Sequence, residues 1–414
     1  MDMRKLTAPL LAMALALSAG ASLMTALPTA AEAQTAGGWR KEVAEKAQAA
    51  QEAGKKGNYK EAISLLKEAK AKGSLSPQEE QGVNELMIWA ASGSKDYALL
   101  AATIEERLAS GRVKGSDQVA KLDTLAKTYF TMREYRKCAD AADRLIKARG
   151  SATADDLVML GQSQFLIKNY SAAAATLEKA YPAVRKAGKP AKTQVQVLET
   201  LNASYFELKN EPKRIETLHQ LMLVQPKVSV FEQLVSQYQK ERLDSVAMLN
   251  LYRLGDRKGV LAKDHWGKYA DAALDLVSPG EAVAALEKGM ANGGIKKDDR
   301  STRLLADAKQ QVDGLKKNLA QQEREAKAIA DGDADAKLAT TLFTLGERAK
   351  AVETARRALQ KGKLNRADDV QFLLGVALFD QKKVGEARSA FAEASKANPK
   401  NAGIANLWED VAAG

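Results

Sequence analysis

Few residues of this chain could carry chemistry, and those few stand apart from one another. The two histidines, His219 and His265, lack the i, i+4 or H-E-x-x-H spacing with which a helix binds zinc. The single cysteine, Cys138, can form neither an internal disulfide nor a structural zinc site. We therefore expect all three side chains to pack inside the protein, with Cys138 as a buried, inert thiol.

An acidic cluster near the end of the chain has the alternation of a calcium-binding loop but fails as one. Asp331, Asp333 and Asp335 are followed by Ala336 where the loop requires glycine, and by Leu342 where it requires a bidentate glutamate. The sequence also contains no G-x-S-x-G, P-loop or G-x-G-x-x-G motif. The short stretch after the last repeat helix leaves no room for an appended catalytic domain. We therefore expect a protein that is no enzyme and binds no metal or cofactor.

The start of the chain has the form of a secretory signal. Basic residues at 4–5 precede an apolar stretch at 6–27. Ala31 and Ala33 then make the A-x-A pattern that signal peptidase reads, with Gln34 as the first residue of the mature chain. We expect cleavage, export to the bacterial periplasm and no stable membrane insertion afterwards. An uncleaved anchor is the alternative, because the apolar stretch is long enough to span a bilayer.

Charge and composition favour a helical protein without a nucleic-acid partner. Lys and Arg number 63 against 52 Asp and Glu, which gives a net charge of +11. The two signs are interleaved along predicted helices, and no compact arginine-rich block appears, so we expect no nucleic acid among the partners. Alanine, leucine, lysine, glutamate and glutamine dominate, while prolines number only 9. This balance favours helices packed closely on helices.

A repeat runs through the chain. Tyr59, Tyr97, Tyr135 and Tyr170 recur at intervals of 38, 38 and 35 residues, each at a turn that leads into a helix with small and large residues at fixed spacing. A partner helix with 3.6-residue periodicity lies before most of these turns. A single hairpin of this kind cannot bury its apolar face, so neighbouring hairpins must supply the core. The sequence thus predicts an all-α fold, an α-solenoid of stacked antiparallel helix hairpins.

The spacing of these residues resembles the tetratricopeptide repeat family. One unit has its ladder of small, large and aromatic residues as Leu125, Ala126, Tyr129, Cys138 and Ala142, and the last has it as Leu374, Gly375, Ala387, Phe391 and Ala394. The carboxy-terminal half is also similar to secreted tetratricopeptide-repeat proteins of Gram-negative bacteria. Some relatives in that group are associated with TonB/ExbB-type energy-transduction systems.

The repeat pattern weakens in the middle of the chain and divides it. Pro212, Ile215 and His219 stand where small residues are usual, residues 298–329 read as one long helix, and residues 331–336 read as a break. We expect four segments: a signal at 1–33, an amino-terminal array at 40–260, a degenerate hairpin with a long helix at 261–330, and carboxy-terminal repeats at 334–414.

The resemblance implies a concave groove lined by the first helix of each hairpin. Carried over position by position, it predicts these partner-binding residues: Trp89, Lys127, Phe130, Gln162, Phe165, Phe206 and Phe379. Exposed aromatic side chains would offer large contact area at low entropy cost. The alternative is that they pack against the neighbouring repeat. The pair Asp123 and Lys127 does not reproduce the family's carboxylate clamp, which disfavours recognition of a C-terminal carboxylate.

We therefore expect a non-catalytic periplasmic scaffold that binds a protein or an extended peptide of the cell envelope through the concave face at 80–260. A partner in a TonB-like or envelope-assembly complex is the most concrete version. The alternative is a module that handles peptidoglycan or another polysaccharide, because aromatic side chains also stack on sugar rings. The sequence leaves the oligomeric state open.

Overall fold

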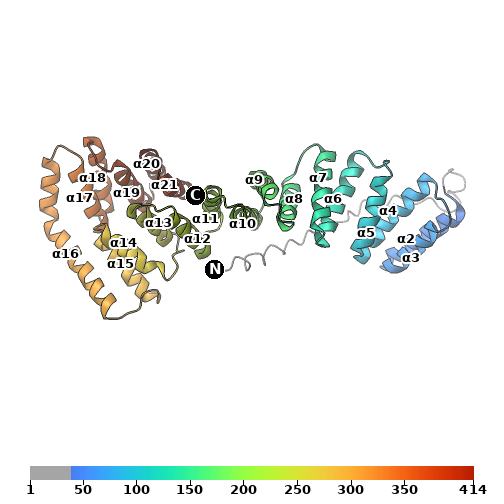
Figure 1. Ribbon diagram of the computed structural model, residues 1–414, viewed down its shortest axis with the longest axis horizontal. Coiled ribbons are helices and arrows are strands. Elements are labelled where there is room, and N and C mark those ends of the chain that lie inside the picture. The colour runs from blue at the N-terminus through green and yellow to red at the C-terminus, as the bar shows by residue number, and fades with distance from the viewer. Residues whose placement is uncertain (1–38) are drawn as a thin grey trace. The chain divides into compact units, whose positions relative to one another are not determined.

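The computed structural model describes residues 39–414, and every regular element in that range is a helix (Figure 1). The described residues form two compact units, the first ending at Asn210 and the second spanning Glu211–Gly414. The expected signal segment and its cleavage point lie outside the described residues. Within 39–414 no helix combines the length and the apolar character needed to cross a membrane.

The first unit is a succession of helix pairs in which each helix packs on the one before it. Its helices are α2 (Lys41–Lys55), α3 (Tyr59–Lys70), α4 (Pro77–Ser94), α5 (Tyr97–Ala109), α6 (Gly115–Thr131), α7 (Tyr135–Arg149), α8 (Ala154–Leu166), α9 (Tyr170–Lys186) and α10 (Ala191–Glu207). Connections of a few residues make neighbouring helices antiparallel.

The second unit continues in the same way but includes one helix of 30 residues, α16. Its helices are α11 (Glu211–Val224), α12 (Val228–Lys240), α13 (Ser245–Arg257), α14 (His265–Asp275), α15 (Pro279–Ala291), α16 (Asp299–Ala328), α17 (Asp333–Thr344), α18 (Arg348–Lys361), α19 (Ala367–Asp380), α20 (Val384–Ala397) and α21 (Ala402–Ala413). The last helix also contacts α11 and α13, so the end of this unit packs against its beginning.

The turn inside each hairpin has one recurring backbone form. The residue two places before the second helix has a positive φ, and it is glycine in only some hairpins. The residues at this place include Gly57, Lys95, Arg133, Lys168, Val277, Gly346 and Lys382. In all the positive-φ turns of the described residues except those at Gly73 and Gly414, φ lies between 51° and 84°. The next residue donates its N–H to a carbonyl in the last turn of the first helix, as in Asp96 to Ala91 at 2.9 Å and Ser278 to Ala273 at 2.8 Å. This is the Schellman ending of a helix, which explains why the repeats stay in phase.

Small residues on the first helix let a large residue of the second helix lie against it. A Cβ added to Gly161 would lie 2.7 Å from Leu177, and one added to Gly375 would lie 2.5 Å from the ring of Phe391. Leu177 and Phe391 are both fully buried. The close approach is therefore a glycine accommodating a large side chain.

The predicted all-α fold of stacked helix hairpins is confirmed. The all-α hairpin stack is present in both units, and the long helix expected at 298–329 is α16. The boundary between compact units lies at 210/211, whereas the sequence predicts the end of the first array near 260. Helix α13 belongs with the second unit because it packs against α14 and α21. The expected break at 331–336 is short, since α17 already begins at Asp333.

The turn at Val277 gives a direct test of the repeat geometry. Val277 has a φ of 53° and is 66% exposed, so its β-branched side chain adds strain and little packing. We expect Val277→Gly to stabilise the protein by about 1 kcal/mol, measured as a higher urea midpoint by circular dichroism. The control, Val312→Gly in the middle of α16, should destabilise it by about 1 kcal/mol or more. A loss of stability in both variants would contradict the left-handed turn.

Candidate functional site

The aromatic side chains predicted to line a groove contact other aromatic side chains of the protein. Trp89 packs edge-on against Tyr59 with ring centroids 5.6 Å apart, and Phe130 packs in the same way against Tyr135 at 5.6 Å. Phe165 is buried in a core cluster, with its ring centroid 5.5 Å from that of Tyr170. Phe165 therefore takes part in the packing of its hairpin and is only 9% exposed.

The remaining predicted groove residues do not form a continuous exposed row either. Lys127 is held by Asp123 on its own helix at 2.7 Å, and Gln162 is buried, with neither amide atom hydrogen-bonded. Phe379 packs edge-on against Trp408, with ring centroids 5.5 Å apart. Phe206 is 39% exposed and stands out as the most accessible of the predicted aromatics. Packing against neighbours, the alternative left open by the sequence, describes most of the ladder.

The isolated histidines and the cysteine lie inside the helical packing. Burial lowers the pKa of His219 to about 4, and its Nε2 lies 2.7 Å from the hydroxyl of Tyr238. His265 lies among aromatic rings with its pKa lowered by burial. Burial raises the pKa of the Cys138 thiol to about 11, and the hydroxyl of Ser163 donates to its sulfur at 3.2 Å. In residues 39–414 no three His, Cys, Asp or Glu side chains are grouped to hold a metal ion.

A cavity of about 350 Å³ in the second unit is the strongest candidate site. It lies where α13, α17 and the start of α19 converge, next to the turn between α14 and α15. Its lining residues are Val246, Leu249, Asn250, Arg253, Leu276, Ser278, Asp333, Ala336, Lys337, Thr340, Asn365, Arg366, Asp369, Val370 and Leu373. This volume falls in the range of clefts that bind small molecules or anchor side chains.

The cavity has an apolar floor and a charged rim. Leu249, Val370 and Leu373 are buried and supply the floor, whereas Lys337 and Arg366 are exposed at the rim. Such an arrangement suits a ligand that is apolar along its length and charged or polar at one end.

Acidic side chains gather around Arg366 at the rim. One guanidinium nitrogen of Arg366 lies 2.9 Å from Asp369, 3.1 Å from Asp368 and 3.3 Å from Asp244. Burial and then the negative charge of Asp368 raise the pKa of Asp369 to about 6, against the opposing effect of Arg366. One arginine therefore pairs with three carboxylates, and the negative charge of Asp369 is the least compensated of the three.

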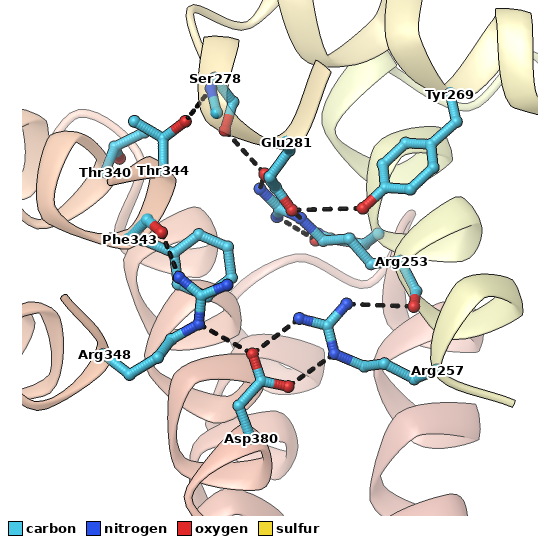
Figure 2. Close-up of polar contacts among 12 residues, drawn as sticks. Arg253, Arg257, Tyr269, Ser278, Glu281, Thr340, Phe343, Thr344, Arg348 and Asp380 are labelled. Atoms are coloured by element: carbon cyan, nitrogen blue, oxygen red, sulfur yellow. Dashed lines mark hydrogen bonds and ion pairs between the residues drawn. The ribbon is translucent and has the colours of Figure 1, made fainter. Parts of the chain in front are cut away.

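Arg253, which lines the cavity, forms a buried ion pair with Glu281 (Figure 2). Arg253 donates from Nε to Glu281 Oε1 at 2.9 Å and from Nη2 to Oε2 at 2.5 Å. The hydroxyls of Ser278, at 2.7 Å, and Tyr269, at 3.4 Å, donate to the same carboxylate. Burial acts to raise the pKa of Glu281, but the charge and hydrogen bonds of Arg253 outweigh it and hold the pKa below its ordinary value. The carboxylate is therefore fully satisfied in a site without water contact.

The same network continues to α18 and α19 through Phe343 (Figure 2). The guanidiniums of Arg253 and Arg348 lie over the Phe343 ring, 5.0 and 3.8 Å from its centroid. Asp380 accepts from Arg257 at 2.7 and 2.8 Å and from Arg348 at 2.9 Å. These contacts hold α13 against α19, two helices that are more than a hundred residues apart in the sequence.

The cavity is closed at its other end by contacts from α21 and the start of α19. The indole nitrogen of Trp408 donates to the carbonyl of Asn250 at 3.0 Å. Asn401 donates to Asp244 at 2.9 Å, on the carboxylate that Arg366 also contacts. The cavity is thus a product of the second unit folding back on itself.

Sequence reasoning missed this site because its parts look ordinary when read locally. Asp368 and Asp369 follow Arg366 at the start of a helix, where acidic residues commonly stabilise the helix dipole. Arg253, Arg257 and their partners read as solvated charges on amphipathic helices. The one usable signal was the cluster of unlike charges R-A-D-D at the beginning of a predicted repeat helix.

Comparison with known proteins gives a partial family match and remote structural likenesses. Residues 336–402 match the tetratricopeptide repeat family model, so this part of the chain carries tetratricopeptide repeats. No curated protein matches the sequence.

Solved structures resemble the chain at low identity. The complex of Naa15 and Naa10 bound to HypK-THB is 15% identical with a TM-score of 0.39, and the match covers 89% of this chain and 55% of that one. A tetratricopeptide repeat protein from Parabacteroides merdae is 13% identical with a TM-score of 0.32, covering 89% of this chain and 99% of that one. The TPR2AB domain of yeast Sti1 in complex with pHSP90 is 12% identical with a TM-score of 0.25, covering 72% and 99%. This chain thus spans little more than half the length of the first of these proteins.

The buried pair makes a clear stability prediction. Glu281→Gln keeps the side-chain volume but leaves the Arg253 guanidinium buried without its counter-charge. We expect a loss of about 3–5 kcal/mol in the free energy of unfolding, measured by urea denaturation. The control, Lys309→Gln, breaks the exposed pair between Lys309 and Glu287 and should change stability by less than about 1 kcal/mol. Equal effects of the two substitutions would show that the buried pair does not hold the unit together.

Proposed function

We propose that this protein is a non-catalytic scaffold that binds a protein or extended peptide, and that the second-unit cavity is its main contact site. The observation that carries the proposal is the cavity itself, a preformed hollow with an apolar floor and a charged rim. Support comes from its position. The tetratricopeptide repeat match at 336–402 includes the α17 and α19 walls of the cavity. Repeats of this family are expected to act by binding.

The location of the binding surface differs from the one that the sequence predicts. The expected groove at 80–260 relied on exposed aromatic side chains, and in the first unit several of these are held by neighbouring rings. The second-unit cavity needs no rearrangement of core side chains to become accessible. It is therefore the better-supported contact site. The polysaccharide alternative relied on the same aromatic row and has no independent observation in its favour.

Export to the periplasm is the second part of the proposal. It rests on the basic start, the apolar stretch and the A-x-A pattern ending at Ala33. Within this proposal the partner is a protein of the cell envelope, for example a component of a TonB-like or envelope-assembly complex. That version rests on the resemblance of the carboxy-terminal half to secreted tetratricopeptide-repeat proteins.

Filling the cavity tests where the partner binds. Ala336 lies on α17 in the cavity lining, so Ala336→Trp should occupy the hollow and abolish capture of the partner in a pull-down from envelope extract. The control, Ala306→Trp, places the same ring on an exposed face of α16 and should capture as the native protein does. Melting curves of both variants establish that they are folded.

The pull-down has three possible outcomes, and each favours a different binding site or none. Loss of a partner only in Ala336→Trp supports the cavity as the contact site. Capture of the same partner by all three proteins would move the site elsewhere in the chain. Failure of the native protein to retain any protein would contradict the scaffold proposal.

Export makes its own prediction. We expect the protein recovered from the periplasmic fraction of a Gram-negative host to begin at Gln34, as determined by N-terminal sequencing. Replacing Ala33 with a bulky residue, as in Ala33→Phe, should leave the precursor uncleaved and associated with the membrane. Recovery of the intact chain, beginning at Met1, in the cytoplasm would refute export.

A further inference from the structure

The charges around the cavity are unbalanced, and this imbalance indicates which kind of ligand the cavity binds. Arg253 lines the cavity, but its charge is matched by Glu281. Around the rim, four carboxylates remain for two cations. The carboxylates are Asp244, Asp333, Asp368 and Asp369, and the cations are Lys337 and Arg366.

The two rim cations cannot neutralise this excess. Arg366 is shared among three carboxylates, and Lys337 is exposed with no ion pair to any residue of the described chain. The carboxylate of Asp333 accepts hydrogen bonds from the backbone and side chain of Asn365 and pairs with no cation among the described residues. The protein as a whole has a net charge of +11, but at physiological salt charges more than about 8 Å away are largely screened. The local excess of negative charge therefore governs what enters the cavity.

A second, independent feature also points to a ligand. Asn250 lines the cavity and is only 2% exposed. Its side-chain oxygen accepts from Arg253 at 2.7 Å, whereas its amide nitrogen donates to no group in residues 39–414. The amide nitrogen is thus a free donor at the cavity wall, and a carbonyl oxygen brought in by a ligand can accept from it.

We infer that the cavity receives a lysine or arginine side chain of a protein partner, whose cation pairs with Asp369 while a neighbouring backbone carbonyl accepts from Asn250. The aliphatic stem of such a side chain would lie on Leu249, Val370 and Leu373, which form the apolar floor. This inference rests on the proposed function, because it specifies the chemistry of the partner at the same site.

The acidity of Asp369 gives the binding a pH dependence. Its pKa of about 6 is raised by burial first and by Asp368 second. The charged groups that face it are Arg366 and Asp368 at the start of α19, Asp244 and Arg253 from the α13 side, and Lys337 and Asp333 on α17. A bound cation favours the ionised carboxylate, so affinity should be full above about pH 6 and should fall as the pH drops below it.

The test is a selection of phage-displayed random linear peptides on the mature protein and three variants. Asp369→Asn removes the carboxylate at the cavity, Asp271→Asn removes an exposed one on α14, and Ala336→Trp fills the cavity. We expect the native protein and Asp271→Asn to enrich peptides with Lys or Arg at one fixed position. Asp369→Asn should lose that preference. It should melt at the same temperature or higher, because a carboxylate with a raised pKa destabilises the folded state at neutral pH.

A selected peptide then allows direct measurement. Replacing its fixed Lys by norleucine should weaken binding about tenfold or more, as expected for the loss of a charge-assisted hydrogen bond. For the Lys peptide, binding should weaken as the pH falls through about 6, and this dependence should vanish in Asp369→Asn.

Three other results would overturn the inference. Peptides that depend on the cavity but show no basic preference, or a basic preference that persists in Asp369→Asn, would leave the binding proposal intact and refute the basic side chain. If no enriched peptide is lost on introducing Ala336→Trp, the cavity is not a peptide site, and both proposals fail.

Discussion

The buried pair of Arg253 and Glu281 is the interaction on which the second unit depends. Stacked hairpins need only local packing, but this unit also joins α13 to helices a hundred residues later in the chain. Removing a guanidinium and a carboxylate from water is costly unless their hydrogen bonds are satisfied. Here the carboxylate receives Arg253, Ser278 and Tyr269, and the guanidinium also lies over the ring of Phe343. These hydrogen bonds and the contact with Phe343 offset the desolvation cost.

The contacts among α13, α17 and α19 also determine the shape and the charge of the surface between these helices. The network that holds α13, α17 and α19 together leaves a hollow between them, with hydrocarbon at the bottom and unequal numbers of acids and bases at the rim. Burial and the negative charge of Asp368 raise the pKa of Asp369, although Arg366 lies beside it and is shared by three carboxylates. The site is thus organised before any partner arrives, which lowers the entropic cost of binding. In the first unit Trp89, Phe130 and Phe165 pack against neighbouring rings.

The sequence could predict the features that are local and periodic. The hairpins follow from 3.6-residue periodicity and from turns such as the one before Tyr170, and the length of α16 follows from its uninterrupted polar pattern. The orientation of Phe165 could not be predicted, because the core face and the groove face of the first helix of a hairpin adjoin each other around the helix, one residue (about 100°) apart. The cavity could not be predicted either, since it depends on contacts such as Arg257 to Asp380 between distant segments.

Hydrogen–deuterium exchange of the whole protein, with and without a captured partner, tests the central claim that this cavity is the binding site. The account predicts slower exchange in α13, in α17 and at the start of α19 when the partner is bound, with exchange in α2–α10 unchanged. Protection confined to the first helices of the earlier hairpins, α6, α8 and α10, with the second unit unaffected, would contradict it. That result would return the binding surface to the first unit.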